Sequence, residues 1–225
     1  MNYQKVLEEI KQEIQPFLNE GKLANYIPAL ANVDDKKFAI SIQLFDGNSY
    51  HIGDSNLKFS IQSISKVFTF TLALNHYGKD LYKRVGHEPS GNPFNSLVQL
   101  EYENGIPRNP FINAGALVTA DSLVSIYKKN TFDTILELIK RTSNDETITY
   151  DEEICKSELA HGFRNFALIN MIKSFNNINN DIDEVIDIYF KQCSIMMNTS
   201  QLAKSMLLLR HHRATLLTNA AIISE

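Results

Sequence analysis

A serine and a lysine in the stretch FSIQSISKVFTF, residues 59–70, have the types and the spacing of a nucleophile and its base. Ser63 and Lys66 are three residues apart, so on a helix they share a face. A serine in the first turn of a helix lies near unpaired backbone N–H groups, which favour a developing negative charge. The apolar residues that follow Lys66 would lower the pKa of its amine, which could then take the serine proton.

The spacing alone is weak evidence, because S-x-x-K also occurs at Ser55 and at Ser125. Ser55 lies in an expected loop, and Ser125 lies deep in an expected helix. Only Ser63 lies where a loop is expected to pass into a helix with its lysine on an apolar segment. The competing interpretation is a helix-capping serine cluster beside a lysine whose stem covers apolar surface while its amine reaches water.

A penicillin-recognising enzyme would need further motifs, S-D-N or Y-x-N and then K-[ST]-G. Tyr102-Glu103-Asn104 fits Y-x-N by letter, in a turn-rich stretch. None of the 9 glycines follows Lys-Ser or Lys-Thr. The sequence therefore argues against a working β-lactamase.

Hydrophobic periodicity predicts an α+β protein. Residues 3–19 have helical spacing, and Gly21 is expected to close that helix. Residues 37–52 alternate around the turn signal Asp46-Gly47-Asn48, which predicts a β-hairpin. An isolated hairpin is marginal in water, so further strands are expected, with residues 215–224 a weak candidate. Helices are predicted over residues 63–77, 113–129, 131–142, 164–175, 182–193 and 199–210, with a loop at 176–183.

Composition excludes several classes of function. The 225 residues carry a net charge of −4, with no basic footprint for nucleic acid and no polybasic run for a membrane surface. The charged N-terminal stretch does not resemble a signal peptide, and no apolar run predicts a membrane span. Cys155 and Cys193 lack metal or redox spacing, which favours free thiols in a reducing compartment. We therefore expect a cytoplasmic protein.

Six blocks of sequence resemble the serine-dependent glutaminase family and occur in that family's order. The resemblance implies one domain over residues 1–225 with a β-lactamase/transpeptidase-like fold, an antiparallel sheet flanked by helices with a helical subdomain. It also implies hydrolysis of L-glutamine to L-glutamate and ammonia, no metal or organic cofactor, and a homo-oligomer, dimer or tetramer. The blocks are LANYIPAL (23–30), QSISK (62–66), EPSGNPFNSL (88–97), NPFINAGAL (109–117), SELAHGFRNFAL (157–168) and DIYFKQCSI (187–195).

The same resemblance implies roles for individual residues. Ser63 matches the nucleophile, Lys66 its activating partner, and Tyr189 is a candidate proton donor. The positions that match the substrate site are Tyr26, Ser63, Asn113, Glu158, Asn165 and Tyr189.

Each of these side chains has an ordinary structural explanation when it is taken alone. Tyr26 would be a packed aromatic residue, Asn113 a helix N-cap, Glu158 a solvated helix residue, and Tyr189 part of the core.

The resemblance is incomplete at its C-terminal side. The family domain continues with another site tyrosine, a K-S-G-like strand and a second oxyanion N–H, and nothing in residues 207–225 matches these. We therefore expect the C-terminal strands to be missing. Loss of one oxyanion donor typically costs about 10²–10³ in rate. An alternative hypothesis is thus a catalytically impaired fragment or a partner-dependent subunit.

Overall fold

Two compact units make up the chain in the computed structural model, which describes residues 1–210. The first unit contains residues 1–60, 139–148 and the described residues from 196 onward, and the second contains 61–138 and 149–195. Helices dominate, with short antiparallel strands, so the α+β prediction is confirmed. Whether the chain is a single domain stays a prediction, and the candidate strand at 215–224 lies outside the described residues.

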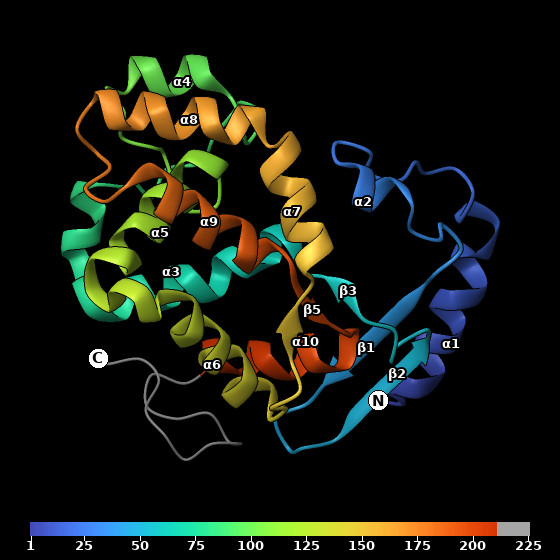
Figure 1. Cartoon of the computed structure of the whole chain (residues 1–225). Helices are drawn as coiled ribbons and strands as arrows, with labels where there is room; N and C mark the ends of the chain where they lie inside the picture. Colours follow the sequence, from blue (N-terminus) through green and yellow to red (C-terminus); the bar gives the residue numbers. More distant parts are fainter. Residues whose placement is uncertain (211–225) are drawn as a thin grey trace. The chain divides into compact units, whose positions relative to one another are not determined.

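A β-hairpin is the centre of the first unit (Figure 1). Its strands pair in the register Ala39↔Gly53 to Gln43↔Ser49, as the alternating apolar pattern predicts. A second pairing joins Phe59↔Met197 and Ser60↔Met196. The elements are α1 (Tyr3–Ile14), η1 (Gln15–Phe17), α2 (Pro28–Ala31), β1 (Ala39–Gln43), β2 (Ser49–Gly53), β3 (Phe59–Ser60), α10 (Thr199–Ser205) and η5 (Met206–Arg210), while β5 (Ile195–Met197) begins in the second unit.

Helices α1 and α10 contact the two faces of this hairpin. On one face the ring of Tyr3 in α1 packs against Tyr50 in β2, with ring centroids 5.4 Å apart. On the other face the Ser41 hydroxyl of β1 hydrogen-bonds Thr199 Oγ1 (2.8 Å) and Ser200 Oγ (3.1 Å) at the start of α10. The alternation of strand side chains therefore separates an apolar face from a polar one.

The second unit is built around α5 (Asn113–Tyr127), in which every residue from Ala114 to Val124 is buried. A mostly apolar helix that is buried on all sides belongs in the core of a unit. Helices α3, α8 and α9 pack against it. The other elements are η2 (Gln62–Ser65), α3 (Lys66–Tyr77), η3 (Gly78–Lys83), α4 (Leu97–Tyr102), η4 (Lys128–Asn130), β4 (Thr149–Tyr150), α7 (Glu152–His161), α8 (Phe163–Ser174) and α9 (Ile182–Cys193), and α6 (Thr131–Ser143) ends in the first unit.

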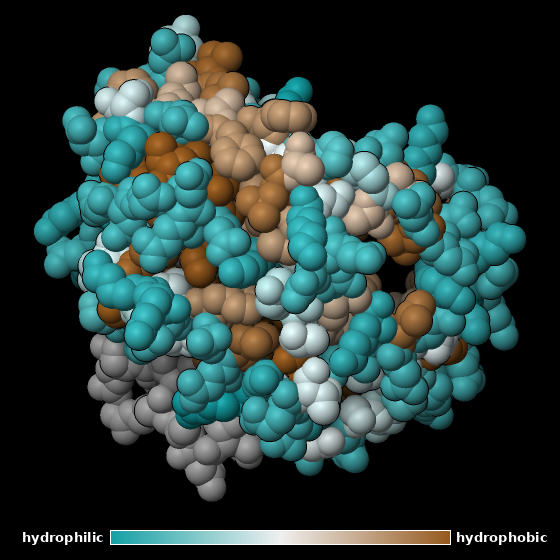
Figure 2. All heavy atoms as spheres, viewed as in Figure 1, coloured by the Kyte–Doolittle hydropathy of each residue, from teal (hydrophilic) through white to brown (hydrophobic). Residues whose placement is uncertain are grey.

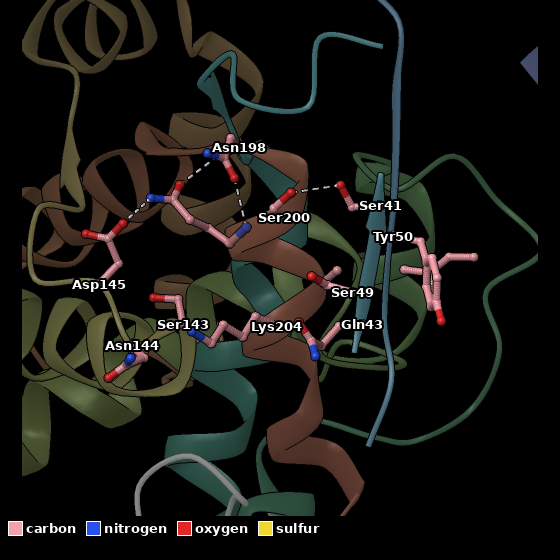
Figure 3. A pocket seen from close by; sticks show the side chains of 13 residues that line it. Ser41, Gln43, Ser49, Tyr50, Ser143, Asn144, Asp145, Asn198, Ser200 and Lys204 are labelled. Atoms are coloured by element: carbon pink, nitrogen blue, oxygen red, sulfur yellow. Dashed lines mark hydrogen bonds between the residues drawn. The ribbon is translucent and has the colours of Figure 1, made fainter. Parts of the chain in front are cut away.

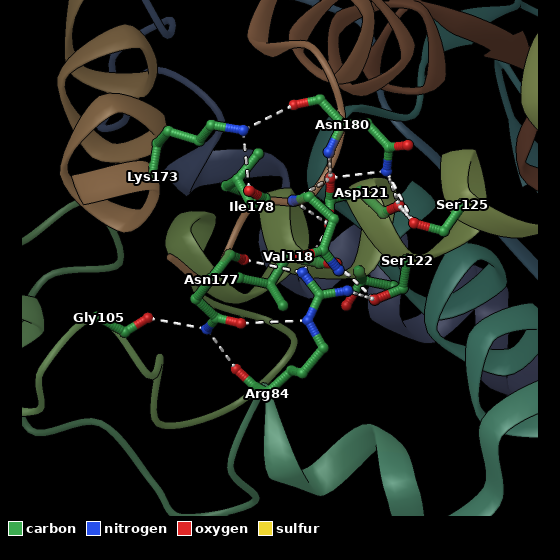
Figure 4. Close-up of polar contacts among 12 residues, drawn as sticks. Arg84, Gly105, Val118, Asp121, Ser122, Ser125, Lys173, Asn177, Ile178 and Asn180 are labelled. Atoms are coloured by element: carbon green, nitrogen blue, oxygen red, sulfur yellow. Dashed lines mark hydrogen bonds and ion pairs between the residues drawn. The ribbon is translucent and has the colours of Figure 1, made fainter. Parts of the chain in front are cut away.

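A buried carboxylate ties the loop before α9 to α5 (Figure 4). Asp121 of α5 is fully buried and forms an ion pair with Arg84 Nη2 at 2.5 Å. Its oxygens also accept hydrogen bonds from the backbone N–H groups of Asn179 and Asn180. Asn177 completes the cluster, since its amide oxygen accepts from Arg84 Nε. The loop predicted at residues 176–183 is thus present and is fixed by polar contacts.

Two sequence predictions need correction. The first helix was expected over residues 3–19, but α1 ends at Ile14 and a 3-10 turn follows, because Pro16 has no N–H to continue the helical hydrogen bonds. Gly21 therefore does not close that helix. Helix α7 was not predicted, and neither were the strands β3, β4 and β5, whose two or three residues are too few for a periodic pattern.

Candidate active site

Ser63 lies in the short 3-10 turn η2, one turn before α3. The residue before it, Gln62, has φ of 45°, a left-handed conformation that is costly for a residue with a Cβ. Strained backbone of this kind clusters at functional sites. The Ser63 side chain is exposed, whereas the Ser65 hydroxyl is buried and donates to Gln62 O at 2.6 Å. Of these two hydroxyls, only that of Ser63 is presented to solvent.

Lys66 is the first residue of α3, and its side chain is buried, with 2% of the residue exposed. Its Nζ donates to the Phe111 carbonyl oxygen at 3.0 Å and to Asn113 Oδ1 at 2.8 Å. Burial lowers the pKa of Lys66 from 10.5 to about 8, because removal from water disfavours the charged amine. The expected pKa shift is confirmed, and the interpretation of Lys66 as a lysine that reaches into water is wrong.

Asn113 connects Lys66 to α8. It is the first residue of α5, with Ile112 as the N-cap, so the N-cap interpretation of Asn113 is wrong. Its Nδ2 donates to Asn165 Oδ1 of α8 at 3.0 Å. Gly115, two residues further along α5, lets the Asn109 carbonyl oxygen lie against the helix, because a Cβ there would collide with it.

Glu158 and Tyr189 come from two helices, α7 and α9, that pack against each other. Each helix begins at an aspartate N-cap whose carboxylate accepts two backbone N–H groups, Asp151 for α7 and Asp181 for α9. Glu158 is 3% exposed, so its interpretation as a solvated residue is wrong, while Tyr189 is 2% exposed. Both side chains therefore face the interior of the second unit.

Cys193 lies among these groups, one helical turn after Tyr189. Burial raises the pKa of its thiol to about 12, Glu158 raises that pKa further, and Lys66 lowers it. The electrostatic influence of both charged groups places Glu158 and Lys66 within interaction range of one thiol. A thiol held protonated in this way is a poor nucleophile.

Five of the six expected substrate-site residues therefore belong to one unit. Lys66, Asn113 and Asn165 form a continuous hydrogen-bonded chain in that unit. Tyr26 belongs to the first unit and is 58% exposed, so its interpretation as a packed aromatic residue is wrong. The decoys differ from Ser63, since Ser55 is buried and the Ser125 hydroxyl donates to Asp121 O within α5.

Sequence patterns missed two groups of this site. The Phe111 carbonyl oxygen accepts a hydrogen bond from Lys66 Nζ, and a pattern of side-chain types cannot reveal a backbone acceptor. Cys193 was interpreted only as a buried thiol, although its position four residues after Tyr189 places the two on one helical face. Among residues 1–210, no group of three or more His, Cys, Asp or Glu side chains could hold a metal ion. The expectation that no cofactor is needed stays a prediction.

Comparisons with known proteins agree with this arrangement. The family described as Glutaminase matches residues 21–225. The glutaminase of Aliarcobacter butzleri is 70% identical over 225 residues, which are 100% of this chain and 74% of that protein. The glutaminase of Rhizobium leguminosarum bv. trifolii is 44% identical over 222 residues, 98% of this chain and 72% of that protein.

Solved structures show the same likeness. The structure of a "Probable glutaminase ybaS" has a TM-score of 0.89 and 32% identity, covering 100% of this chain and 73% of its own. A probable glutaminase of Bacillus subtilis has a TM-score of 0.87 and 30% identity, covering 99% and 69%. The expected β-lactamase-like fold is thereby supported, and the partial coverage is consistent with the expected lack of C-terminal strands. The chain belongs to the glutaminase family.

Proposed function

We propose that the chain hydrolyses the side-chain amide of L-glutamine, with Ser63 as the nucleophile and Lys66 as its base. One observation carries the proposal most strongly. An exposed hydroxyl stands at a strained turn, three residues before a buried lysine whose pKa is lowered to about 8. A lysine that is partly neutral near pH 7 can act as a general base, whereas an ordinary lysine cannot.

Hydrogen bonding at Lys66 favours the direction of proton transfer. A neutral amine has two N–H groups and one lone pair. The Phe111 carbonyl and Asn113 Oδ1 accept the two N–H groups, which leaves the lone pair for the Ser63 proton. As Ser63 Oγ bonds to the amide carbon, its proton passes to Lys66. The C–N bond then breaks, and ammonia leaves with a proton from Lys66 or from Tyr189.

The acyl-enzyme formed in this way is an ester between Ser63 and the glutamyl side chain. A water molecule attacks the ester carbon and gives its proton to the base. The C–O bond to Ser63 then breaks, glutamate is released, and the serine hydroxyl is restored. No oxidant or reductant is needed at any step.

Substrate recognition is assigned to the polar side chains around Lys66. The Glu158 carboxylate would pair with the substrate ammonium, a charge-assisted contact. Asn113 and Asn165 each carry an amide NH₂ with two donors, and within residues 1–210 the structure records one of these four N–H groups in use, between the two residues. The remaining donors, with the Tyr26 hydroxyl, would bind the carboxylate and the amide oxygen.

Ammonia release from L-glutamine is the direct test, and Ser63→Ala is the key variant. We expect turnover by the 225-residue chain and its loss in Ser63→Ala. Ser55→Ala is the matched control, because it removes the serine of a decoy S-x-x-K pair and should keep the activity. A mass increase on Ser63 after glutamine is mixed and quenched would identify the acyl-enzyme. Equal turnover by Ser63→Ala and the unaltered chain would reject the assignment.

A second candidate function is an impaired or partner-dependent glutaminase. The 225 residues cover 74% of the A. butzleri glutaminase and 73% of the ybaS structure, and this alternative concerns the activity of those residues alone. It predicts that the folded chain binds glutamine weakly, by calorimetry, without releasing ammonia. Turnover by the isolated chain at a rate like that of the A. butzleri protein would eliminate it.

We also propose a cytoplasmic location and a homo-oligomer, dimer or tetramer. Both cysteines are free, as expected in a reducing compartment. None of the described helices is long and apolar enough to cross a membrane. Large apolar side chains such as Phe94 and Phe163 are exposed in the second unit, and Figure 2 shows apolar surface around α7 and α8. Light scattering on a sizing column would measure the assembly, and a monomer at micromolar concentration would contradict it.

A further inference from the structure

A buried hydroxyl holds the peptide that joins Gln62 to Ser63. Ser65 is fully buried, and its Oγ donates to the Gln62 carbonyl oxygen at 2.6 Å. On the N-terminal side, the Ile61 N–H donates to the Ile195 carbonyl oxygen at 2.9 Å. The turn is thus fixed through the backbone at Ile61, while the next carbonyl group along the chain is held by a side chain.

Gln62 needs such a contact because its backbone is strained. Its φ of 45° lies in the left-handed region, which a residue with a Cβ avoids. A conformation of this kind persists only where the surrounding structure imposes it. Loss of the Ser65 hydrogen bond would therefore let the turn relax toward ordinary right-handed backbone.

The orientation of this peptide matters at Ser63 because a peptide unit is planar. The Gln62 C=O and the Ser63 N–H belong to one trans peptide and point in opposite directions. A hydroxyl that fixes the carbonyl therefore also fixes the direction of the Ser63 N–H and the position of the Ser63 Cα. Within residues 1–210, no acceptor is recorded for the Ser63 N–H, so this group is available to a substrate oxygen.

The Cys193 thiol of α9 interacts with the same hydroxyl. Ser65 and Tyr189 are two of the side chains that influence this thiol. An ionised thiol would compete with the Gln62 carbonyl for the Ser65 proton. Burial raises the pKa of Cys193 to about 12, so the thiol stays protonated at neutral pH and leaves that proton to the carbonyl.

We propose that Ser65 is a positioning residue, whose hydroxyl holds the strained peptide between Gln62 and Ser63 in the orientation that amide hydrolysis needs. Ser65 is fully buried, so it acts through Ser63 and not on the substrate. The inference rests on the proposed role of Ser63 as the nucleophile. It concerns kcat, because the orientation of a nucleophile affects bond formation more than substrate binding.

Ser205→Ala is a matched control for Ser65→Ala. Ser205 is fully buried too, and its Oγ donates to the carbonyl oxygen three residues earlier, that of Leu202, at 2.8 Å. Each variant loses one buried hydrogen bond of the same kind, so urea unfolding should show similar losses of stability. Only Ser65→Ala should lower kcat, by roughly tenfold, with KM within roughly twofold. The inflection that Lys66 gives near pH 8 should stay, because its own contacts are kept.

The helix that carries Ser205 keeps its other contacts in the control. Asn198 and Gln201 form a capping box at the start of α10. Gln201 Nε2 also donates to Asp145 Oδ2 at 2.7 Å, beside a polar hollow of about 290 Å³ (Figure 3). None of these contacts uses the Ser205 hydroxyl, so α10 should stay in place.

Two backgrounds at Gln62 separate positioning from stability. Gln62→Gly removes the Cβ and with it the cost of a positive φ, whereas Gln62→Ala shortens the side chain and keeps that cost. Ser65→Ala should lower kcat roughly tenfold in the Gln62→Ala background and less than roughly threefold in the Gln62→Gly background. The double variant with glycine carries less strain, so it provides the test even if Ser65→Ala alone does not fold.

An NMR measurement tests the same contact without turnover. The Cα and Cβ chemical shifts of Gln62 depend on φ and ψ, so they should move in Ser65→Ala and stay constant in Ser205→Ala. The proposed function and this inference can therefore fail separately. An unaltered chain that releases no ammonia rejects the function, and Gln62 shifts that do not move in Ser65→Ala reject the inference.

Other outcomes would also overturn the proposal. One is a kcat of Ser65→Ala equal to that of Ser205→Ala. Another is a raised KM with an unchanged kcat, which would assign Ser65 to substrate binding. A third is an equal loss of kcat in the Gln62→Gly and Gln62→Ala backgrounds, which would show that strain at Gln62 plays no part.

Discussion

Ionisation of Lys66 should set the pH dependence of the reaction. The pKa of this amine is lowered from 10.5 to about 8 by burial, and its charged form cannot accept the Ser63 proton. At pH 7 a group with a pKa of 8 is roughly one-tenth neutral, whereas at a pKa of 10.5 the neutral fraction is roughly one in 3,000. The shift therefore increases the amount of active base by roughly 300-fold at pH 7.

The assay is kcat/KM for glutamine between pH 6 and 9.5, followed by coupled detection of ammonia. Activity should be lost as pH falls through 8, with a roughly tenfold decrease for each unit below it and a plateau above. Lys66→Arg stays charged at every pH in this range, so it should lose roughly 10²–10⁴ in rate and the inflection near 8. Lys191→Arg is the control, because Lys191 pairs with Asp187 at 2.7 Å and is not assigned to the site.

The same shift predicts a change in stability. Between pH 8 and 10.5 the unfolded chain binds more protons at Lys66 than the folded chain does, so the free energy of unfolding should rise with pH. The rise is about 3 kcal/mol over the window, and it should be absent in Lys66→Met. A flat rate profile from pH 6 to 9, or an inflection near 10.5 in folded protein, would refute this account of Lys66.

Three further substitutions have definite expected outcomes. Glu158→Gln removes the proposed partner of the substrate ammonium and should raise KM roughly tenfold to hundredfold, which steady-state kinetics would measure; an unchanged KM would contradict the assignment. Asp121→Ala leaves Arg84 and two loop N–H groups without their acceptor and should lower the free energy of unfolding in urea by about 3–5 kcal/mol. Gln192 is fully buried, and neither amide atom has a partner in the described chain, so Gln192→Met should raise that free energy by about 1–3 kcal/mol. A lower free energy of unfolding in Gln192→Met would show that the Gln192 amide makes a stabilising contact.

The sequence predicted the longer elements because their hydrophobic periods are clear. The hairpin at residues 37–52 and the helix at 182–193 are present with small changes of boundary. Pattern alone could not place elements that depend on tertiary contacts. Helix α7 lacks a simple apolar stripe, and β3 has two residues whose strand geometry comes from pairing with β5.

Some features of the candidate site could be predicted from sequence, and others could not because they depend on tertiary contacts. Three-residue spacing and apolar neighbours were enough to predict the lowered pKa of Lys66, because burial of that helix follows from its own residues. For Asn113 the alternative interpretation as an N-cap is wrong, and only the structure shows that its side-chain amide contacts Lys66 and Asn165. The assignment of catalytic roles stays a prediction.

The order in which the chain leaves the ribosome has a consequence for the first unit. Its hairpin emerges early, but the Thr199 hydroxyl that binds Ser41 lies 158 residues further along the chain. At synthesis rates of about 5–20 residues per second, the polar face of β1 stays uncovered for roughly 8–32 s, until α10 has been synthesised. During that time the hairpin has one uncovered face as well as its strand edges, and such a ribbon is a site for mispairing between nascent chains. Yield of folded protein should therefore depend on the rate of translation between codons 44 and 199, even where the finished chain is stable.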